Sequence, residues 1–230
     1  MKRRLFLKRT TPALGLLMFP HLLKAKAQKE LPNVLILGDS ISIGYTPFVQ
    51  EQMKGIAKVV RPLRENGSNE NCQGTTNGVK HIDRWLGDTQ WDIIHFNFGL
   101  HDLKRVDPET GKNSMKPEDP YQANLKQYKN QLTTIVKKLK KTKAILIFAT
   151  TTPYPDVPAG PLRTADLPEK YNSVALKIMK KNDILVNDLH RFVIPRMKEL
   201  QIPNNVHFTK EGSKVLAKEV VSFIHKILNK

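Results

Sequence analysis

The sequence has a single cysteine, Cys72, in 230 residues, so no internal disulfide bond can hold the fold together. It contains no Gly-x-Gly-x-x-Gly or Walker phosphate loop, no paired-cysteine zinc pattern and no Gly-x-Ser-x-Gly motif. These absences disfavour a nucleotide-binding loop, a structural zinc site and the serine elbow of the α/β-hydrolases. After the amino-terminal segment, no apolar run approaches the length that spans a membrane.

Residues 1–27 are predicted to be a signal peptide. The segment begins with basic residues that include Arg3-Arg4, continues with an apolar stretch, and ends in Ala25-Lys26-Ala27, a small-x-small cleavage signal. The paired arginines and the residues after them resemble the twin-arginine export signal. We therefore expect an exported protein, periplasmic or extracellular, with a single domain in residues 28–230. An ordinary secretory signal or a retained amphipathic anchor is the alternative.

The chain is strongly basic, with 38 Lys and Arg against 21 Asp and Glu and a net charge of +17. Residues 1–27 hold seven of the basic residues and none of the acidic ones, which leaves +10 for residues 28–230. We expect no nucleic-acid partner, because the protein is predicted to be exported and no aromatic-interleaved basic motif is present. The excess charge is compatible with an acidic polysaccharide or a cell surface.

The spacing of apolar segments predicts an α/β fold with a parallel sheet. Short buried runs alternate with longer amphipathic stretches, a pattern typical of β-α-β units with helices on both faces of the sheet. Strands are expected at residues 34–37, 57–60, 92–98, 144–149 and 184–186. Helices are expected at 42–53, 120–140, 168–180, 189–200 and 209–228. A further helix, which Thr76 or Asn77 could cap, is expected to reach Leu86.

Three polar segments are predicted to meet at one edge of this sheet. Gly38-Asp39-Ser40 ends the first strand, the segment 97–102 follows the third strand, and the segment 203–208 precedes the last helix. In open parallel sheets, ligands bind outside the carboxyl ends of the strands. A serine needs a base to act as a nucleophile, and His207 is the candidate base for Ser40. The alternative is that Asp39 and Ser40 only cap the following helix.

These segments, in this order, resemble the sequence blocks of the SGNH, or GDSL-like, hydrolase family. The run from Gly38 to Ser42 is similar to the first block, which contains the nucleophilic serine, and Gly74-Thr75-Thr76 looks like the second, whose glycine N–H joins the oxyanion hole. Gly99-Leu100-His101-Asp102 resembles the third block, Gly-x-Asn-Asp, and Val206-His207-Phe208 the fifth. The resemblance implies a flavodoxin-like, five-stranded α/β/α sandwich and a serine esterase that needs no metal or other cofactor.

Two positions depart from the family pattern. His101 stands where the family has an asparagine that donates to the oxyanion, and a histidine with a suitable N–H can donate in its place. Asn204 stands where the family has the aspartate that orients the catalytic histidine. Three arrangements stay open: Asn204 orients the ring through its amide oxygen, a carboxylate such as Asp102 or Asp188 does so, or the site is a Ser-His dyad.

The resemblance and the export signal together imply an exported serine esterase. Its expected substrates are O-acyl esters, with O-acetyl as the expected case, on small or polymeric carbohydrates. The expected catalytic residues are Ser40, His207, Asn204 and Asp102. The expected oxyanion and substrate contacts are Gly74, His101, Gly99 and Asp39. Two alternatives are a non-catalytic carbohydrate-binding protein on the same scaffold and a metal-dependent phosphoesterase with Asp39, His101, Asp102 and His207 as ligands.

Overall fold

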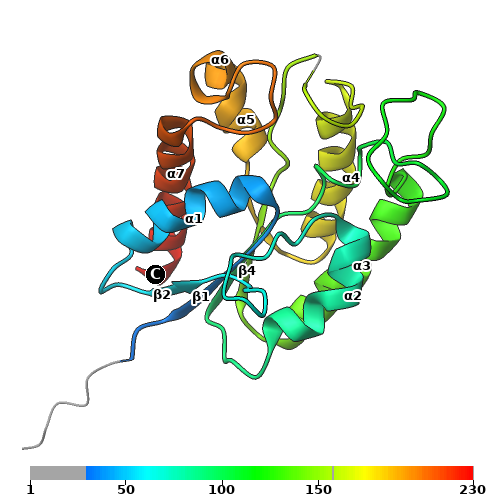
Figure 1. Cartoon of the computed structure of the whole chain (residues 1–230). Helices are drawn as coiled ribbons and strands as arrows, with labels where there is room; N and C mark the ends of the chain where they lie inside the picture. The colour runs from blue at the N-terminus through cyan, green and yellow to red at the C-terminus, as the bar shows by residue number, and fades with distance from the viewer. Residues whose placement is uncertain (1–29, 157, 230) are drawn as a thin grey trace, which may run out of the picture. The chain divides into compact units, whose positions relative to one another are not determined.

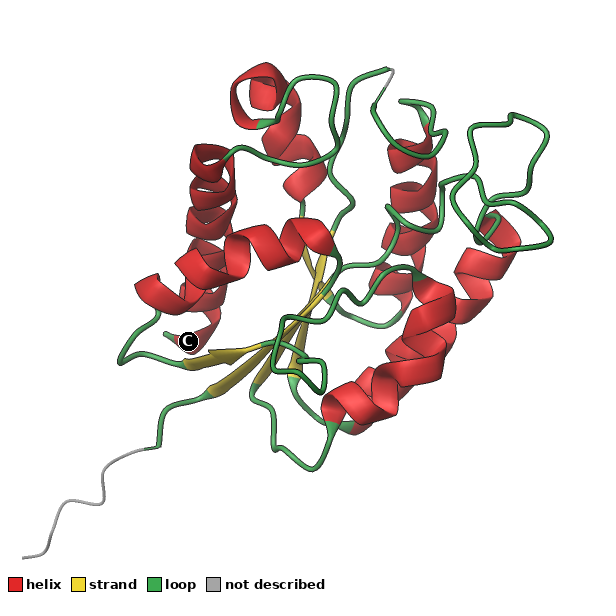
Figure 2. Cartoon of the chain, in the orientation of Figure 1, coloured by secondary structure: helices red, strands yellow, loops and turns green. Residues whose placement is uncertain are grey.

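The computed structural model describes residues 30–156 and 158–229, and the predicted signal peptide at residues 1–27 lies outside them. The described strands and helices all belong to one compact unit, residues 31–230. Five parallel strands form a sheet in the order β2-β1-β3-β4-β5. Figure 2 shows this sheet between two groups of helices. The three-layer α/β/α sandwich and the five-stranded parallel sheet predicted from the sequence are confirmed.

The strands lie close to their predicted positions and bring three loops to one edge. They are β1 (Asn33–Leu37), β2 (Lys58–Val60), β3 (Ile93–Phe96), β4 (Ile145–Ala149) and β5 (Leu185–Asn187). Leu37 of β1 pairs with Phe96 of β3, and Phe96 pairs with Phe148 of β4. Because the strands are parallel and end together, the chain leaves β1, β3 and β4 at the same side of the sheet.

The helices are α1 (Ser40–Gln52), α2 (Thr75–Leu86), α3 (Leu125–Lys141), α4 (Leu167–Lys181), α5 (Leu189–Val193), α6 (Met197–Leu200) and α7 (Lys210–Leu228). Helices α1 and α7 pack together over one face of the sheet, and α2, α3 and α4 cover the other (Figure 1). A 3₁₀ turn containing Pro195 separates α5 from α6, in the stretch predicted as one interrupted helix. No helix in the described residues is long and apolar enough to cross a membrane.

The start of α3 differs from its prediction. The sequence pattern predicts a helix from Pro120, whereas the observed helix begins five residues later, at Leu125. Asn124 and Gln127 form a capping box, in which each side chain accepts a backbone N–H of the other residue. This box satisfies free donors at the helix start and fixes the boundary there.

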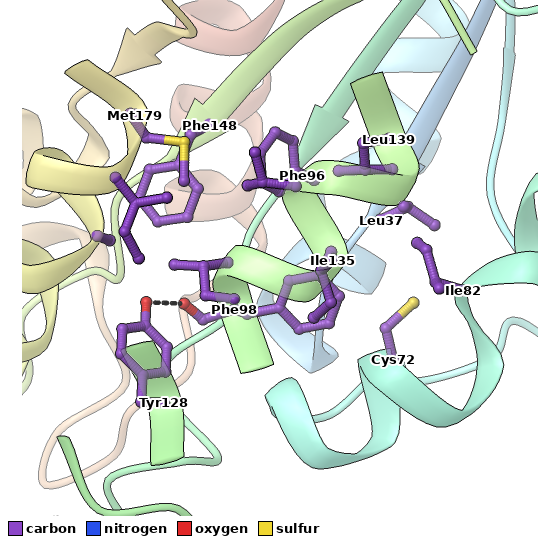
Figure 3. Packing of buried hydrophobic residues seen from close by; sticks show 14 of the residues in the cluster. Leu37, Cys72, Ile82, Phe96, Phe98, Tyr128, Ile135, Leu139, Phe148 and Met179 are labelled. Atoms are coloured by element: carbon purple, nitrogen blue, oxygen red, sulfur yellow. Dashed lines mark hydrogen bonds between the residues drawn. The ribbon is translucent and has the colours of Figure 1, made fainter. Parts of the chain in front are cut away.

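One half of the core also fixes the segment that enters the site. Phe96 and Phe98 are fully buried between the sheet and the helices α2 and α3 (Figure 3). Tyr128 of α3 donates its hydroxyl to Phe98 O at 2.8 Å, directly before Gly99. Cys72 lies in the same cluster, and burial raises the pKa of its thiol to about 12. The cysteine is therefore a packing residue and not a reactive thiolate.

Candidate active site

Ser40 is the first residue of α1 and follows the carboxyl end of β1. Asp39 caps the helix, since one of its carboxylate oxygens accepts the N–H of Ile41 at 2.9 Å. The N–H of Ser40 has no partner within the helix, as is usual for the first turn, and none elsewhere in the described chain. Ser40 is half-buried, and its hydroxyl and its own free N–H thus lie together at the positive end of the α1 dipole.

A buried arginine holds the turn that presents Ser40. Arg61, just after β2, donates from Nη1 to Ser42 Oγ at 3.0 Å and from Nη2 to Gly38 O at 3.2 Å. Ser42 in turn donates its hydroxyl to Asp39 O at 2.7 Å. Arg61 has no predicted role, because nothing in the local sequence marks this arginine for burial.

His207 lies directly against Ser40. Its Nε2 is 2.8 Å from Ser40 Oγ, although the two residues are 167 positions apart in the chain. The loop that carries His207 is fixed by the bridge between Gln201 and Phe208 and by the N–H of Ile202, which donates to His207 O at 2.9 Å. The structure therefore brings Ser40 and His207 together at this edge of the sheet.

Asn205 faces the other ring nitrogen of His207. Its Oδ1 lies 2.8 Å from His207 Nδ1 and also accepts the backbone N–H of His207 at 3.0 Å. A backbone N–H can only donate, so the amide atom beside it is assigned as oxygen, and this same oxygen faces Nδ1. Nδ1 must then carry the proton, which leaves the lone pair of Nε2 directed at Ser40 Oγ.

This arrangement corrects the predicted position of the orienting residue by one. Asn204 is exposed and has a φ of 52°, a left-handed conformation that asparagine adopts more readily than most residues. Its carbonyl oxygen accepts the N–H of Ala159 at 2.6 Å. Asn205 instead makes an Asx-type turn, in which an asparagine accepts the N–H two residues further on. The spacing Asn-x-His is a sequence signal that could have identified it.

The two carboxylates considered as orienting groups lie elsewhere. Asp102 Oδ1 accepts the backbone N–H of Thr75 at 2.8 Å and also its hydroxyl, at the start of α2. Asp188 Oδ1 accepts the hydroxyl of Thr150 at 2.9 Å. Neither carboxylate is hydrogen-bonded to His207 in the described structure. Asp102 is completely buried, and this burial raises the pKa of its carboxyl to about 7.

Gly74 contributes a second free N–H to this edge. It immediately precedes α2, and its N–H has no hydrogen-bond partner among the described residues. A Cβ at this position would lie 2.8 Å from Gln122 Nε2 and 2.9 Å from Asp102 Cγ, so a larger residue would push against these side chains. The N–H of Cys72 donates to Gly38 O at 3.1 Å, which ties this loop to the nucleophile turn.

His101 is an uncharged ring close to the pair. Burial, aided by the positive charges of Lys104 and Arg163, lowers its pKa to about 3. Its Nδ1 is enclosed without a partner in the described chain, so Nε2 is the nitrogen that can reach a ligand. Gly99 shapes this segment, because a Cβ there would lie 2.1 Å from Thr151 Oγ1. The neutral ring fits a hydrogen-bond donor in the place of the family's asparagine.

The side chains considered as metal ligands have other partners. Among the described residues, no group of three or more His, Cys, Asp or Glu side chains is arranged to hold a metal ion. Asp39 caps α1, Asp102 binds Thr75, and His207 faces Ser40. The metal-dependent alternative therefore has no ligand cluster in this part of the chain.

A pocket of about 570 Å³ lies beside the loop that carries His207. The proline-rich loop after β4 and the segment 194–204 line it, mostly with apolar side chains that include Tyr154 and Pro203. The two walls are joined by the hydrogen bond from Ala159 N–H to Asn204 O. Its volume lies in the range that holds small ligands.

The sequence profile of the GDSL-like Lipase/Acylhydrolase family matches residues 36–215, a span that includes the nucleophile turn and the His207 loop. The chain belongs to this family. The GDSL-like domain makes the protein an ester hydrolase with a Ser-His pair at the expected edge of its sheet.

Solved structures share the fold of this GDSL-like chain at low sequence identity. A lipase/acylhydrolase from Enterococcus faecalis is 17% identical, with a TM-score of 0.66 over 84% of this chain and 95% of that one. The acetyl xylan esterase AlAXEase is 14% identical, with a TM-score of 0.64 over 84% and 99%. A carbohydrate esterase family 3 protein from Talaromyces cellulolyticus is 17% identical, with a TM-score of 0.61 over 86% and 99%. Comparison with curated sequences gave no match.

Proposed function

We propose that this GDSL-like hydrolase is a serine esterase that removes acyl groups, with O-acetyl as the expected case, from carbohydrate. The observation that carries the proposal is the contact of 2.8 Å between Ser40 Oγ and His207 Nε2, together with the Asn205 oxygen that faces His207 Nδ1. This geometry places a hydroxyl proton beside a basic nitrogen whose tautomer is fixed.

In the first half of the reaction, His207 Nε2 takes the hydroxyl proton of Ser40 while Oγ attacks the ester carbonyl carbon. The N–H groups of Ser40 and Gly74 and the Nε2–H of His101 hold the oxyanion that forms. Each such donor typically contributes about 3 kcal/mol to the transition state. His207 then gives its proton to the departing alcohol oxygen, which leaves the acyl group bound to Ser40.

In the second half, water replaces the alcohol. His207 Nε2 takes a proton from the water molecule as its oxygen attacks the acyl carbon. The second tetrahedral intermediate collapses, the proton returns to Ser40 Oγ, and the carboxylic acid leaves. Asn205 keeps the proton on Nδ1 throughout, so Nε2 alternates between base and acid without a change of tautomer.

The carbohydrate substrate is proposed from three observations of different kinds. Two of the structures that share the fold are named as an acetyl xylan esterase and a carbohydrate esterase. The pocket of about 570 Å³ beside the His207 loop has room for one or two sugar rings or for an acyl group. Residues 28–230 keep a net positive charge, which suits a polysaccharide that carries acidic groups.

The proposal is tested with 4-nitrophenyl acetate and acetylated xylan. The wild type and Ser222→Ala, a matched substitution of an exposed serine on α7, should release nitrophenol and acetate at the same rates. Ser40→Ala and His207→Ala should fall to the background rate. Rates for the wild type and Ser40→Ala that are equal and at background would instead favour carbohydrate binding without catalysis.

We further propose that residues 1–27 direct export as a twin-arginine signal. The support is the basic start with Arg3-Arg4, the apolar stretch and the site ending at Ala27. When the full chain is expressed, the protein should be recovered outside the cytoplasm with Gln28 as its first residue. A variant with Arg3→Lys and Arg4→Lys should stay in the cytoplasm uncleaved. Wild-type protein that remains in the cytoplasm at full length would contradict export.

A further inference from the structure

Arg163 is a buried cation that the proposed reaction does not use. It lies in the proline-rich loop between β4 and α4, and only 7% of its surface is exposed. Its Nε donates to Leu100 O at 3.3 Å, and the guanidinium makes no other hydrogen bond within the described chain. No carboxylate in that part of the chain forms an ion pair with it. A buried charge with so few partners is costly, and a ligand of opposite charge would offset the cost.

The terminal nitrogens of Arg163 have no hydrogen-bond partner in the described chain and are not fully enclosed. The enclosed and unpartnered atoms of the described residues include Arg61 Nε, but neither Nη1 nor Nη2 of Arg163. The end of the guanidinium that can form two parallel hydrogen bonds therefore has no protein partner in the described chain, although the residue as a whole is buried. This planar fork matches the two oxygens of a carboxylate.

Arg163 is close to both halves of the candidate active site. Leu100, which accepts its Nε–H, directly precedes His101. Burial raises the pKa of Asp39, next to Ser40, and the positive charge of Arg163 acts against this rise. The charges of Arg163 and of the half-buried Lys104 also add to the effect of burial in lowering the pKa of His101. The guanidinium is therefore within electrostatic range of the nucleophile turn and of the His101 segment.

The backbone next to Arg163 is held firmly. The N–H of Leu162 donates to Ser114 O at 2.8 Å, and Leu162 O accepts the N–H of Arg105 at 3.1 Å. These two bonds join the proline-rich loop to the chain between β3 and α3. The backbone that carries Arg163 is thus anchored before a substrate arrives, and the side chain is held by its bond to Leu100 O.

We propose that Arg163, assisted by the charge of Lys104, binds a carboxylate on the sugar that carries the ester, so that the preferred substrates are esters of uronic acids in acidic glycans. This inference rests on the proposed esterase function and adds the substrate class to it. The carboxylate would pair with the terminal nitrogens of the guanidinium and would lie beside the segment that holds the oxyanion. The net charge of +10 on residues 28–230 would attract a polyanionic chain to the protein.

The test uses two matched probes. One is an O-acetylated methyl galacturonoside with a free carboxylate, and the other is its uronamide, in which a neutral amide replaces the carboxylate. The wild type should hydrolyse the acid with a kcat/KM about tenfold or more above that of the amide. A hydrogen bond to a charged group contributes a binding free energy that corresponds to a factor of this size. Arg163→Gln should bring the ratio close to one, mainly through a higher KM for the acid.

Two further variants separate charge recognition from a general loss of structure. Arg163→Lys keeps the charge but not the fork and should retain part of the preference. Lys129→Gln removes an exposed positive charge from α3 and should leave the ratio unchanged. A wild-type ratio near one, or an unchanged ratio in Arg163→Gln, would overturn the proposal and leave the esterase function standing.

A separate measurement covers failure of the esterase function itself. If the wild type hydrolyses neither the two probes nor 4-nitrophenyl acetate, the proposed function fails. The affinity for a free uronic acid then tests whether Arg163 binds a carboxylate. Calorimetric titration with galacturonate should show at least tenfold weaker binding to Arg163→Gln than to the wild type. Equal affinities, or no binding to the wild type, would overturn the inference.

Discussion

The substitution Asn205→Asp tests how far a neutral residue can replace the usual carboxylate of a catalytic triad. In the structure, Asn205 Oδ1 faces His207 Nδ1 at 2.8 Å and accepts the backbone N–H of His207. The amide therefore already selects the tautomer in which Nε2 is the acceptor for the Ser40 proton. What it cannot supply is a negative charge beside the imidazolium that forms during the reaction.

The gain from that charge follows from its distance and exposure. Two unit charges about 4 Å apart interact by about 1 kcal/mol in water and about 4 kcal/mol near a protein surface. Both Asn205 and His207 are half-buried and still in contact with solvent, which favours the lower part of this range. A stabilisation of about 1–2 kcal/mol corresponds to a rise in kcat of roughly 5- to 30-fold. If the amide instead held the wrong tautomer, Asn205→Asp would raise kcat by about 10⁴-fold, the loss seen when an asparagine replaces the aspartate of the Ser-His-Asp triad.

The assay is steady-state hydrolysis of 4-nitrophenyl acetate across the pH range, with thermal unfolding as a check on the fold. Asn205→Asp should raise kcat by roughly 5- to 30-fold and shift the acid limb of the pH–rate profile to higher pH. Asn204→Asp is the matched control, and with this small substrate it should change kcat less than twofold because Asn205, not Asn204, is bonded to His207. A gain of 10³-fold or more, no gain in Asn205→Asp, or an equal gain in Asn204→Asp would refute the assignment of Asn205.

Three other predictions concern the oxyanion side of the site. Gly74→Ala should lower kcat on 4-nitrophenyl acetate about 10²-fold, because the added Cβ would meet Gln122 and Asp102 and displace the N–H that binds the oxyanion. Its circular dichroism spectrum should show that the fold is retained. His101→Ala should lower kcat about 10²- to 10³-fold and His101→Asn should keep most of it; equal rates in both would exclude a donor role. Asp102 has a pKa of about 7 when folded and 3.8 when unfolded, so its contribution to stability is present below pH 4 and is lost as pH rises through 7. Wild-type urea midpoints should fall across this window and those of Asp102→Asn should not; the same slope in both would contradict the assignment.

The fold is largely predictable from the sequence because its strands are unmistakable apolar runs. The run Val34–Leu37 is buried on both faces, and the segments around Ile94 and Ile147 repeat this character at distances that leave room for crossover helices. Helix boundaries are less certain, since they depend on caps. The Asn124 box that starts α3 is present in the sequence, but an apolar pattern alone extends the predicted helix back to Pro120.

The active-site pair is predictable for the same reason, because parallel topology brings the residues after different strands to one edge. The contact between Ser40 and His207 follows from that topology. The orienting residue does not follow from the topology; it is indicated only by the local Asn-x-His spacing, in which Asn205 accepts the N–H of His207. Arg61 and Arg163 also escape prediction, since the burial of a long charged side chain is decided by segments distant in the sequence.

The central claim is that Ser40 forms a covalent bond to the substrate acyl group. The most direct measurement is mass spectrometry after treatment with diethyl 4-nitrophenyl phosphate, which transfers a diethylphosphoryl group to an activated serine. We expect one added group on the wild type, located on the peptide that contains Ser40, with loss of esterase activity in parallel and no addition to Ser40→Ala. Addition at a different residue, or continued hydrolysis by Ser40→Ala at the wild-type rate, would contradict the account.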